Sequence, residues 1–342
     1  MTAAQTTRPV AMDFLRSAED EIREVVEFRE SGAAPAASVI IPTFNRRSLI
    51  LDTLEAIAAQ EPADFEVIVA DDCSTDGSAT ATIDACRRLG LAGRLVSLRR
   101  NRGPATARNC ALHVARAGTI AFTDSDCIPT PGWLATGLSA FRPDVGVVQG
   151  RVLPPGDVTI PFFSHFIHME SLDGSFATCN AFYRREALQQ AGGFDPGCLD
   201  WEDRDIGCRV LSLGWEAVYE PEALVYHQVL SQSPAEWMRW PGQLVNLPKW
   251  VKRHPGARRY LFGRYWVNPA HAALTAAVIG AMLAPKYRPA LLLTLPYLAS
   301  IPVRHGLGGR WPLAKAALHV WWDALGVASA AAGSLRNRKL VL

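Results

Sequence analysis

The sequence predicts an α/β protein in which a mostly parallel sheet is flanked by helices, followed by an α-helical C-terminal region. Short apolar runs lack polar alternation, as strands buried on both faces do. Helical stretches alternate with these runs, which is the pattern of parallel sheets covered by helices. Apolar residues make up 49% of the 342 residues and charged residues 20%, a globular balance that excludes a disordered or collagen-like chain.

The N-terminal segment from Met12 to Glu30 carries apolar residues at helical spacing, among them Phe14, Ile22 and Val26. A glycine- and proline-containing stretch at 31–35 then interrupts the pattern. We therefore expect an amphipathic helix and a linker over residues 1–36.

The central region, residues 37–230, contains the alternating strands and helices. The predicted strands cover residues 38–41, 65–70, 94–98 and 119–122, and the predicted helices lie near residues 47–60, 78–89 and 104–117. Seven cysteines without a CxxC pair, and no signal peptide at the start of the chain, predict free thiols in a reducing compartment. A zinc or disulfide scaffold is not expected.

The C-terminal region, residues 231–342, is strongly basic. It holds 15 Lys and Arg residues but only two acidic residues, Glu236 and Asp323, which gives a net charge of +13. Residues 1–230 hold 20 Lys and Arg residues and 31 Asp and Glu residues, a net charge of −11. Apolar runs at 271–284 and 289–303 are shorter than the roughly 20 residues of a comfortable span, and a third segment at 311–335 carries charges. A soluble helical subdomain is one interpretation. We expect membrane association instead, because anionic leaflets attract basic segments beside apolar helices.

Ligands bind beyond the carboxyl ends of the strands in open parallel sheets, so the loops there are the candidate site. The loop Pro42–Arg46 has no glycine, which excludes the dinucleotide fingerprint, and no Walker loop is present. The carboxylates of Asp124 and Asp126 follow a predicted buried strand and can hold Mg²⁺ or Mn²⁺ bridging a diphosphate. An Asp-x-Asp triplet such as Asp124-Ser125-Asp126 also occurs in ordinary turns. Its position directly after the predicted strand is what favours a metal site.

Adjacent Asp71 and Asp72 end another predicted strand. The residues that follow them, Ser74 to Asp76, are expected to cap the next helix. Capping alone explains the aspartate pair less well, and one of the two could accept a hydrogen bond from a base or ribose. Phe44 could lie beneath that base, although a single Phe is more often a core residue.

Two further polar residues could act in the same crevice. Asp203 stands at the start of a predicted helix and could serve as a general base toward a hydroxyl, although simple helix capping is the alternative. Asp205 and Arg209 form an i, i+4 pair that we expect to be structural. His227 ends an apolar run and could complete a metal shell, although a core histidine is the commoner case.

Several segments together resemble the family-two glycosyltransferases of the GT-A fold. They are Ser38–Asn45 (SVIIPTFN), Val67–Ser78 (VIVADDCSTDGS), Asn101–Asn109 (NRGPATARN), Phe122–Asp126 (FTDSD), Asn180–Glu186 (NAFYRRE), Gly192–Asp195 (GGFD) and Glu202-Asp203 with Arg209. The resemblance covers about residues 37–230, and the C-terminal end, Gly333–Leu342, resembles the tails of membrane-associated bacterial members.

The resemblance implies a nucleotide-sugar donor, a divalent cation (Mg²⁺ or Mn²⁺) and an inverting transfer to an acceptor hydroxyl. The resemblance implies that Pro42 binds substrate, that Phe44 and Asp72 contact the nucleobase, and that Arg108 helps to hold the donor. It implies Asp124 at the ribose, sugar or metal, and Asp126 and His227 at the metal. It implies Asp203 as the general base with Glu202 beside it, and Asn180 and Trp201 bordering the acceptor. Arg102 and Cys73 depart from the family pattern and are expected to reshape the donor pocket.

The resemblance also implies partners and a location. We expect a lipid-linked or glycan acceptor in cell-envelope glycoconjugate synthesis, a place on the cytoplasmic face of the cell membrane, and no nucleic acid partner. Two alternative functions fit the sequence less well. A sugar-phosphate nucleotidyltransferase needs a glycine-rich loop that this chain lacks, and a catalytically silent scaffold would lack a catalytic carboxylate.

Overall fold

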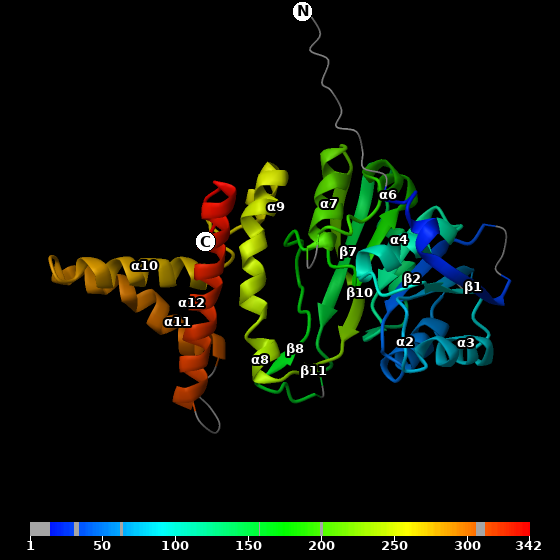
Figure 1. The fold of residues 1–342 in the computed structure, drawn as a ribbon, viewed down its shortest axis with the longest axis horizontal. Coiled ribbons are helices and arrows are strands. Elements are labelled where there is room, and N and C mark those ends of the chain that lie inside the picture. The colour runs from blue at the N-terminus through cyan, green and yellow to red at the C-terminus, as the bar shows by residue number, and fades with distance from the viewer. Residues whose placement is uncertain (1–13, 31–33, 62–63, 157, 199–200, 306–311) are drawn as a thin grey trace, which may run out of the picture. The chain divides into compact units, whose positions relative to one another are not determined.

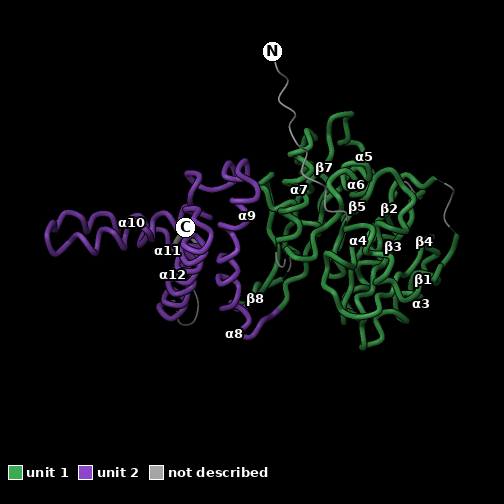
Figure 2. Tube along the Cα trace, turned by 45° about the horizontal axis from the view of Figure 1, so that its top comes forward, with its two compact units in different colours: residues 1–161, 165–230 green, residues 162–164, 231–342 purple. Residues whose placement is uncertain are grey.

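The computed structural model describes residues 14–30, 34–61, 64–156, 158–198, 201–305 and 312–342. The chain forms two compact units (Figure 2), one of residues 1–161 with 165–230 and one of residues 162–164 with 231–342. The first unit carries the sheet and the second is helical, so each is described by itself.

The described residues of the first unit form a nine-stranded sheet in the order β1-β4-β3-β2-β5-β9-β7-β10-β6 (Figure 1). The strands are β1 Ile22–Arg29, β2 Ala37–Thr43, β3 Phe65–Asp71, β4 Gly93–Leu98, β5 Thr119–Thr123, β6 Cys127–Pro129, β7 Val145–Leu153, β9 Asn180–Arg184 and β10 Glu216–His227. A separate two-stranded sheet pairs β8 (Ser164–His165) with β11 (Leu230–Ser231).

The half of the sheet from β4 to β5 is parallel, as predicted from the apolar runs. In β2, Ile40 pairs with Ile68 on one side and Phe122 on the other, and all three side chains are buried. The other half is mixed, because β9 runs antiparallel to both β5 and β7, and only β7 with β10 is parallel. The prediction of a mostly parallel sheet is therefore confirmed for the half of the sheet that carries the predicted loops.

The prediction of an N-terminal helix is wrong over most of the segment. Only Ala18–Glu21 is helical (α1), and Ile22–Arg29 forms the edge strand β1, antiparallel to β4. In β1, Val26 and Phe28 are partly buried and pack on the core, whereas Val25 and Glu27 face solvent. Residues 12 and 13 of the predicted helix lie outside the described residues.

Helices cover both faces of the sheet. Their bounds are α2 Leu49–Ala58, α3 Ser78–Arg88, α4 Pro104–Val114, α5 Trp133–Ser139, α6 Arg185–Ala191 and α7 Glu202–Ser212. One core joins alternate β2 residues Val39 and Ile41 to α2, α3 and α5. On the other face α4 packs on β2 and β3, and Phe122 meets the rings of Tyr183 and Phe194 edge-on, with centroids 5.9 and 5.4 Å away. The strands that lead into the predicted site loops are thus packed on both faces.

The second unit is built from helices α8 Pro234–Trp237, α9 Leu247–Arg253, α10 Pro269–Leu283, α11 Leu295–His305 and α12 Pro312–Asn337, with 3₁₀ turns η1 Trp240–Asn246, η2 Pro255–Tyr260 and η3 Arg288–Thr294. Within it, α12 packs on η1, α9 and α10, and the Tyr297 hydroxyl donates to buried Asp323 over 2.8 Å. The apolar runs at 271–284 and 289–303 therefore form helical elements, as expected. Across the described part of the chain, every helix is too short or too polar to cross a membrane.

Candidate functional site

Hydrogen bonds tie the loop after β2 to the loop after β3. The Asn45 amide donates to the Ser74 hydroxyl over 2.9 Å, and the Thr75 amide donates to the Asn45 side-chain oxygen over 2.9 Å. Of the residues predicted to cap α3, Asp76 accepts from the Ser78 amide at the start of this helix, whereas the Ser74 hydroxyl accepts from Asn45. Phe44 projects from this tied pair of loops with 44% of its surface exposed, so its ring is accessible to a planar ligand.

Asp72 joins the end of β3 to the start of α4. Its carboxylate accepts 2.7 Å hydrogen bonds from the amides of Arg102 and Gly103, and Gly103 has φ +84°, a conformation that favours glycine. Burial raises the pKa of Asp72, and these two amides lower it. Asp72 therefore fixes the loop that leads into α4, and its predicted bond to a base stays a prediction. Pro42 lies within β2, half-buried beside Ala70.

Arg108 of α4 gathers three carboxylates at the edge of the sheet. Its guanidinium lies 3.1 Å from Asp124, at the end of β5, 3.1 Å from Glu202 and 3.5 Å from Asp203, the first two residues of α7. Only 5% of the Arg108 side chain is exposed. Burial alone would lower its pKa, but the three carboxylates raise it above its ordinary value, so the guanidinium stays charged.

The two acids of α7 have perturbed ionisation. Burial, together with the charge of Asp203, raises the pKa of Glu202 to about 7, although Arg108 opposes the shift. Burial also raises the pKa of Asp203, and Arg108 and the Thr178 amide oppose it. Two acids with raised pKa values that share one charged partner are candidates for a functional site.

Thr178 holds Asp203 in place. Its amide donates to one carboxylate oxygen and its hydroxyl to the other, each over 3.0 Å. Thr178 is fully buried and lies two residues before β9, so the carboxylate is fixed from the sheet as well as from α7. Both oxygens keep lone pairs for a further donor.

Asp126 and His227 form a second cluster of polar side chains, in addition to the carboxylates around Arg108. The His227 Nε2 atom lies 3.8 Å from an Asp126 carboxylate oxygen, and the two side chains are 4% and 12% exposed. Asp124, by contrast, is turned toward Arg108. The structure thus brings together two of the three predicted metal ligands, Asp126 and His227, and gives Asp124 an arginine partner.

Asn180 has a different place from the one predicted. It is fully buried, its side-chain nitrogen donates to the carbonyls of Arg151 and Ala223, and its oxygen accepts from the Trp133 indole over 2.8 Å. Its hydrogen-bonding groups are used inside the fold, so this arrangement does not support a contact with the acceptor. Trp201 is the half-buried residue before α7, and the Arg204 guanidinium lies 5.2 Å from its ring centroid.

The sequence reasoning missed three residues of the site: Thr178, His165 and Cys127. The His165 ring lies 6.0 Å from the His227 ring, and burial, His227 and Arg46 lower the pKa of His165 to about 4. No local motif marks Thr178 or His165, because each reaches the site from a segment distant in sequence from its partner. Cys127 directly follows the Asp126 that the motif did mark.

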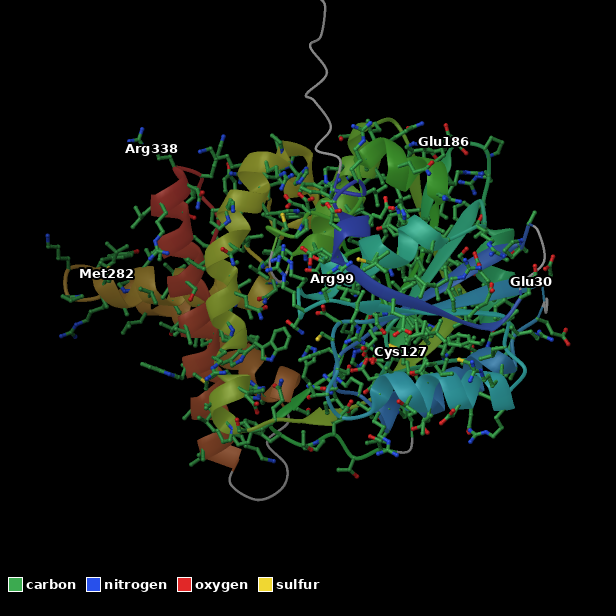
Figure 3. All side chains as sticks on the ribbon, turned by 45° about the vertical axis from the view of Figure 1, so that its right-hand side comes forward. Glu30, Arg99, Cys127, Glu186, Met282 and Arg338 are labelled. Atoms are coloured by element: carbon green, nitrogen blue, oxygen red, sulfur yellow. The ribbon has the colours of Figure 1, made fainter. Side chains whose placement is uncertain are left out.

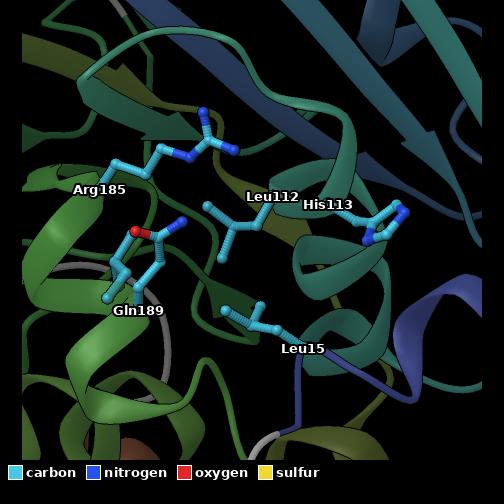
Figure 4. A pocket seen from close by; sticks show the side chains of 6 residues that line it. Leu15, Leu112, His113, Arg185 and Gln189 are labelled. Carbon is cyan, nitrogen blue, oxygen red and sulfur yellow. The ribbon is translucent and has the colours of Figure 1, made fainter.

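A small pocket of about 130 Å³ lies apart from these groups (Figure 4). It is lined by Leu15, Leu112, His113, Arg185, Leu188 and Gln189. None of the predicted site residues lines it, and we assign the chemistry to the Arg108 cluster because the charged groups converge there.

Comparison with known proteins identifies the class. The family model "Glycosyl transferase family 2" matches residues 38–192, and the model "Glycosyl transferase family group 2" matches residues 119–303, which is more than half of the chain. The chain therefore belongs to the family-two glycosyltransferases, which confirms the resemblance and decides against the nucleotidyltransferase alternative.

Among curated relatives, the chain is 39% identical over 92 residues to the putative teichuronic acid biosynthesis glycosyltransferase TuaG of Bacillus subtilis, covering 27% of this chain and 36% of the relative. It is 29% identical over 214 residues to the succinoglycan biosynthesis protein ExoO of Rhizobium meliloti, covering 56% of this chain and 61% of the relative. The chain thus spans less than two thirds of the length of these two relatives.

The fold is similar to that of a solved mannosyltransferase, PcManGT of Pyrobaculum calidifontis, described in complex with GDP-Man and Mn²⁺. The TM-score is 0.57 at 22% identity, over 95% of this chain and 92% of that one. This likeness confirms the expected GT-A fold.

Replacing Glu202 by Gln should change how stability depends on pH. The pKa of about 7 in the folded protein lies above the ordinary value of 4.5, so between these pH values the folded protein keeps a proton that the unfolded chain releases. The wild type therefore loses stability as pH rises through this window, and the Gln variant lacks this loss. Urea unfolding at about pH 5 and about pH 8 should show the variant gaining relative to the wild type. Exposed Glu222→Gln is the control, and parallel pH profiles for Glu202→Gln and the wild type would contradict the assignment.

Proposed function

We propose that the protein transfers a sugar from a nucleotide-sugar donor to an acceptor hydroxyl, with inversion, in the synthesis of a cell-envelope polysaccharide or glycolipid. The observation that carries the proposal is the convergence of Asp124, Glu202 and Asp203 on Arg108, beside Asp126 and His227. The names of the relatives support the substrate class, since TuaG and ExoO are named for teichuronic acid and succinoglycan biosynthesis.

The donor is expected to lie over the loops after β2, β3 and β5. The exposed Phe44 ring offers a stacking surface for a base, and Asp124 and Arg108 lie deeper, toward the sugar. Arg108 helps to hold the donor by fixing Asp124, whose carboxylate can accept hydrogen bonds from ribose or sugar hydroxyls. The sequence has no glycine-rich phosphate loop, so positive charge has to neutralise the diphosphate.

The residues at Asp126 and His227 fit a divalent cation, Mn²⁺ or Mg²⁺. A carboxylate and an imidazole nitrogen lie 3.8 Å apart, close enough to share one ion, and Asp126 keeps partial access to solvent. When bound, such an ion supplies Lewis-acid stabilisation of the leaving diphosphate. Asp126 orients this site through the main chain as well, because its carbonyl accepts from the Gln228 amide over 2.9 Å.

Asp203 is the proposed general base. An acceptor hydroxyl that donates to an Asp203 oxygen passes its proton to that carboxylate while the hydroxyl oxygen attacks the anomeric carbon. The bond between that carbon and the diphosphate oxygen breaks, and nucleoside diphosphate leaves from the opposite face. Thr178 and Arg108 fix the carboxylate, and Arg108 also opposes the rise in its pKa, which keeps the ionised form available. Glu202, hydrogen-bonded to Arg108, is proposed to contact donor or acceptor beside it.

The C-terminal unit is proposed to dock on the cytoplasmic leaflet and to bring a lipid-linked or glycan acceptor to the site. The support is a basic, apolar hairpin formed by α10, η3 and α11. Its large apolar side chains are exposed at Val278, Ile279, Met282, Leu283, Tyr287, Leu291, Leu292, Leu293, Leu295 and Leu298. Met282, labelled in Figure 3, is 75% exposed, and Lys286 and Arg288 lie beside it in sequence. A cluster of exposed apolar side chains marks an interaction surface, and the cations Lys286 and Arg288 match anionic headgroups.

Removing the divalent cation should abolish transfer. Activity should vanish in EDTA and return with Mn²⁺ or Mg²⁺, and Asp126→Asn should lower turnover on the order of 10²-fold or more, because Lewis-acid stabilisation contributes several kcal/mol. Transfer is measured from released nucleoside diphosphate, with exposed Asp84→Asn of α3 as the control. Full activity in chelator would contradict the proposed role of the cation.

Replacing Asp203 by Asn should remove the proton acceptor and retain the shape. We expect kcat to fall by roughly 10²–10⁴-fold, the usual contribution of a positioned general base. Calorimetric titration with nucleoside diphosphate should give an unchanged affinity. A variant that loses binding together with turnover would make Asp203 a donor contact or a structural residue.

Charged substitutions in the hairpin should weaken membrane binding. We expect the full-length protein to sediment with vesicles of mixed anionic and neutral phospholipid and to remain bound in about 1 M salt, where electrostatic attraction is screened and apolar burial is not. The double variant Met282→Asp, Leu292→Asp should be released. The control is Leu213→Asp, at an exposed leucine of the other unit. Wild-type protein that stays in the supernatant would overturn the docking proposal.

A further inference from the structure

Cys127 lies beside the proposed cation site and has no assigned role. It is the first residue of β6 and pairs directly with His227 of β10 in the antiparallel ladder. Side chains of directly opposed residues lie on the same face of a sheet, about 5 Å apart. Figure 3 labels Cys127, and its side chain is fully buried.

The three side chains at this point offer one ligand atom each. The Cys127 sulfur, a carboxylate oxygen of Asp126 and a ring nitrogen of His227 all lie within 4.8 Å of one another. In a tetrahedral zinc site the corresponding atoms lie about 2.0–2.3 Å from the ion. Small side-chain movements are therefore enough to bring all three onto a single ion.

The His227 ring is oriented toward this point. Its Nδ1 atom lies 2.9 Å from the Gln228 carbonyl, and because a carbonyl only accepts, Nδ1 carries the hydrogen. The lone pair is then on Nε2, which lies 3.8 Å from Asp126, beyond hydrogen-bonding distance. A histidine whose other nitrogen is held by a carbonyl is the usual arrangement of a metal ligand.

We propose that Cys127 is a third ligand of this site, so that the site takes thiophilic cations of the zinc class, Zn²⁺, Co²⁺ and Cd²⁺, through Asp126, Cys127 and His227. This inference rests on the proposed cation site. On binding, the Cys127 thiol releases its proton to solvent, and the thiolate and the Asp126 carboxylate together balance the two positive charges. A fourth position stays open for water or a phosphate oxygen.

A cysteine ligand would make the site prefer zinc-class ions over Mn²⁺ and Mg²⁺. Zn²⁺ and Co²⁺ bind nitrogen and sulfur ligands more tightly than Mn²⁺, and Mg²⁺ gains little from sulfur. Zinc-class ions are therefore expected to occupy the site in place of Mn²⁺ or Mg²⁺.

The test is a titration of full-length protein with Co²⁺, followed by absorbance. The wild type should show a near-ultraviolet thiolate-to-cobalt band that saturates at one ion per chain. Cys127→Ser and Cys127→Ala should lose the band and bind Co²⁺ at least about tenfold more weakly, whereas Cys179→Ser, at the thiol that hydrogen-bonds Cys127, and Cys86→Ser of α3 should keep it. Zn²⁺ should displace Co²⁺ and remove the band.

Three results would overturn the inference: wild-type protein without a thiolate band, a band that survives in folded Cys127→Ser or Cys127→Ala, or a band that disappears in Cys179→Ser alone. The wild-type spectrum needs no variant, so a misfolded substitution does not remove the test. The spectrum is also independent of sugar transfer. If the protein shows the thiolate band but no sugar transfer with Mn²⁺, the cation site with Cys127 is supported and the proposed function is contradicted.

Discussion

The buried guanidinium of Arg108 is the interaction on which the rest of the site depends. A charge with 5% of its side chain exposed has lost most of its hydration, and this loss is tolerated only where opposite charges replace the water. Asp124, Glu202 and Asp203 do so from two segments that are distant in sequence. The end of β5 and the start of α7 are thereby fixed relative to α4.

The position of Arg108 is set in turn by Asp72. Its carboxylate accepts from the Arg102 and Gly103 amides, which fixes the loop before α4, and α4 then places Arg108 over β2 and β3. Three carboxylates around one guanidinium leave an excess of negative charge. That excess suits a reaction in which positive charge develops on the sugar and a hydroxyl loses its proton. Burial, with the charge of Asp203 adding to it, raises the pKa of Glu202 to about 7.

The sequence was sufficient for the parallel half of the sheet and for the loops at its carboxyl edge, because apolar runs and motif spacing are local signals. It was insufficient for β1, where Ile22, Val25 and Val26 satisfy helical spacing and only pairing with β4 makes them a strand. The same limit applies to the site. Thr178 lies 25 residues from Asp203 and Cys127 is 100 positions from its strand partner His227, so neither contact leaves a local pattern. Asn180 belonged to a recognisable motif, yet the motif did not show that its amide is used by the fold.

A double-mutant cycle tests most directly whether the charge of Arg108 holds the carboxylates together. The free energy of unfolding is measured at about pH 8 for the wild type, Arg108→Gln, Glu202→Gln and the double variant, because Glu202, with a pKa of about 7, is then ionised. A buried, charge-assisted hydrogen bond predicts a coupling of about 1.5–3 kcal/mol between the two positions. Additive effects, with no coupling, would show that Arg108 and Glu202 are merely adjacent, and would contradict an arrangement of the site around the Arg108 charge.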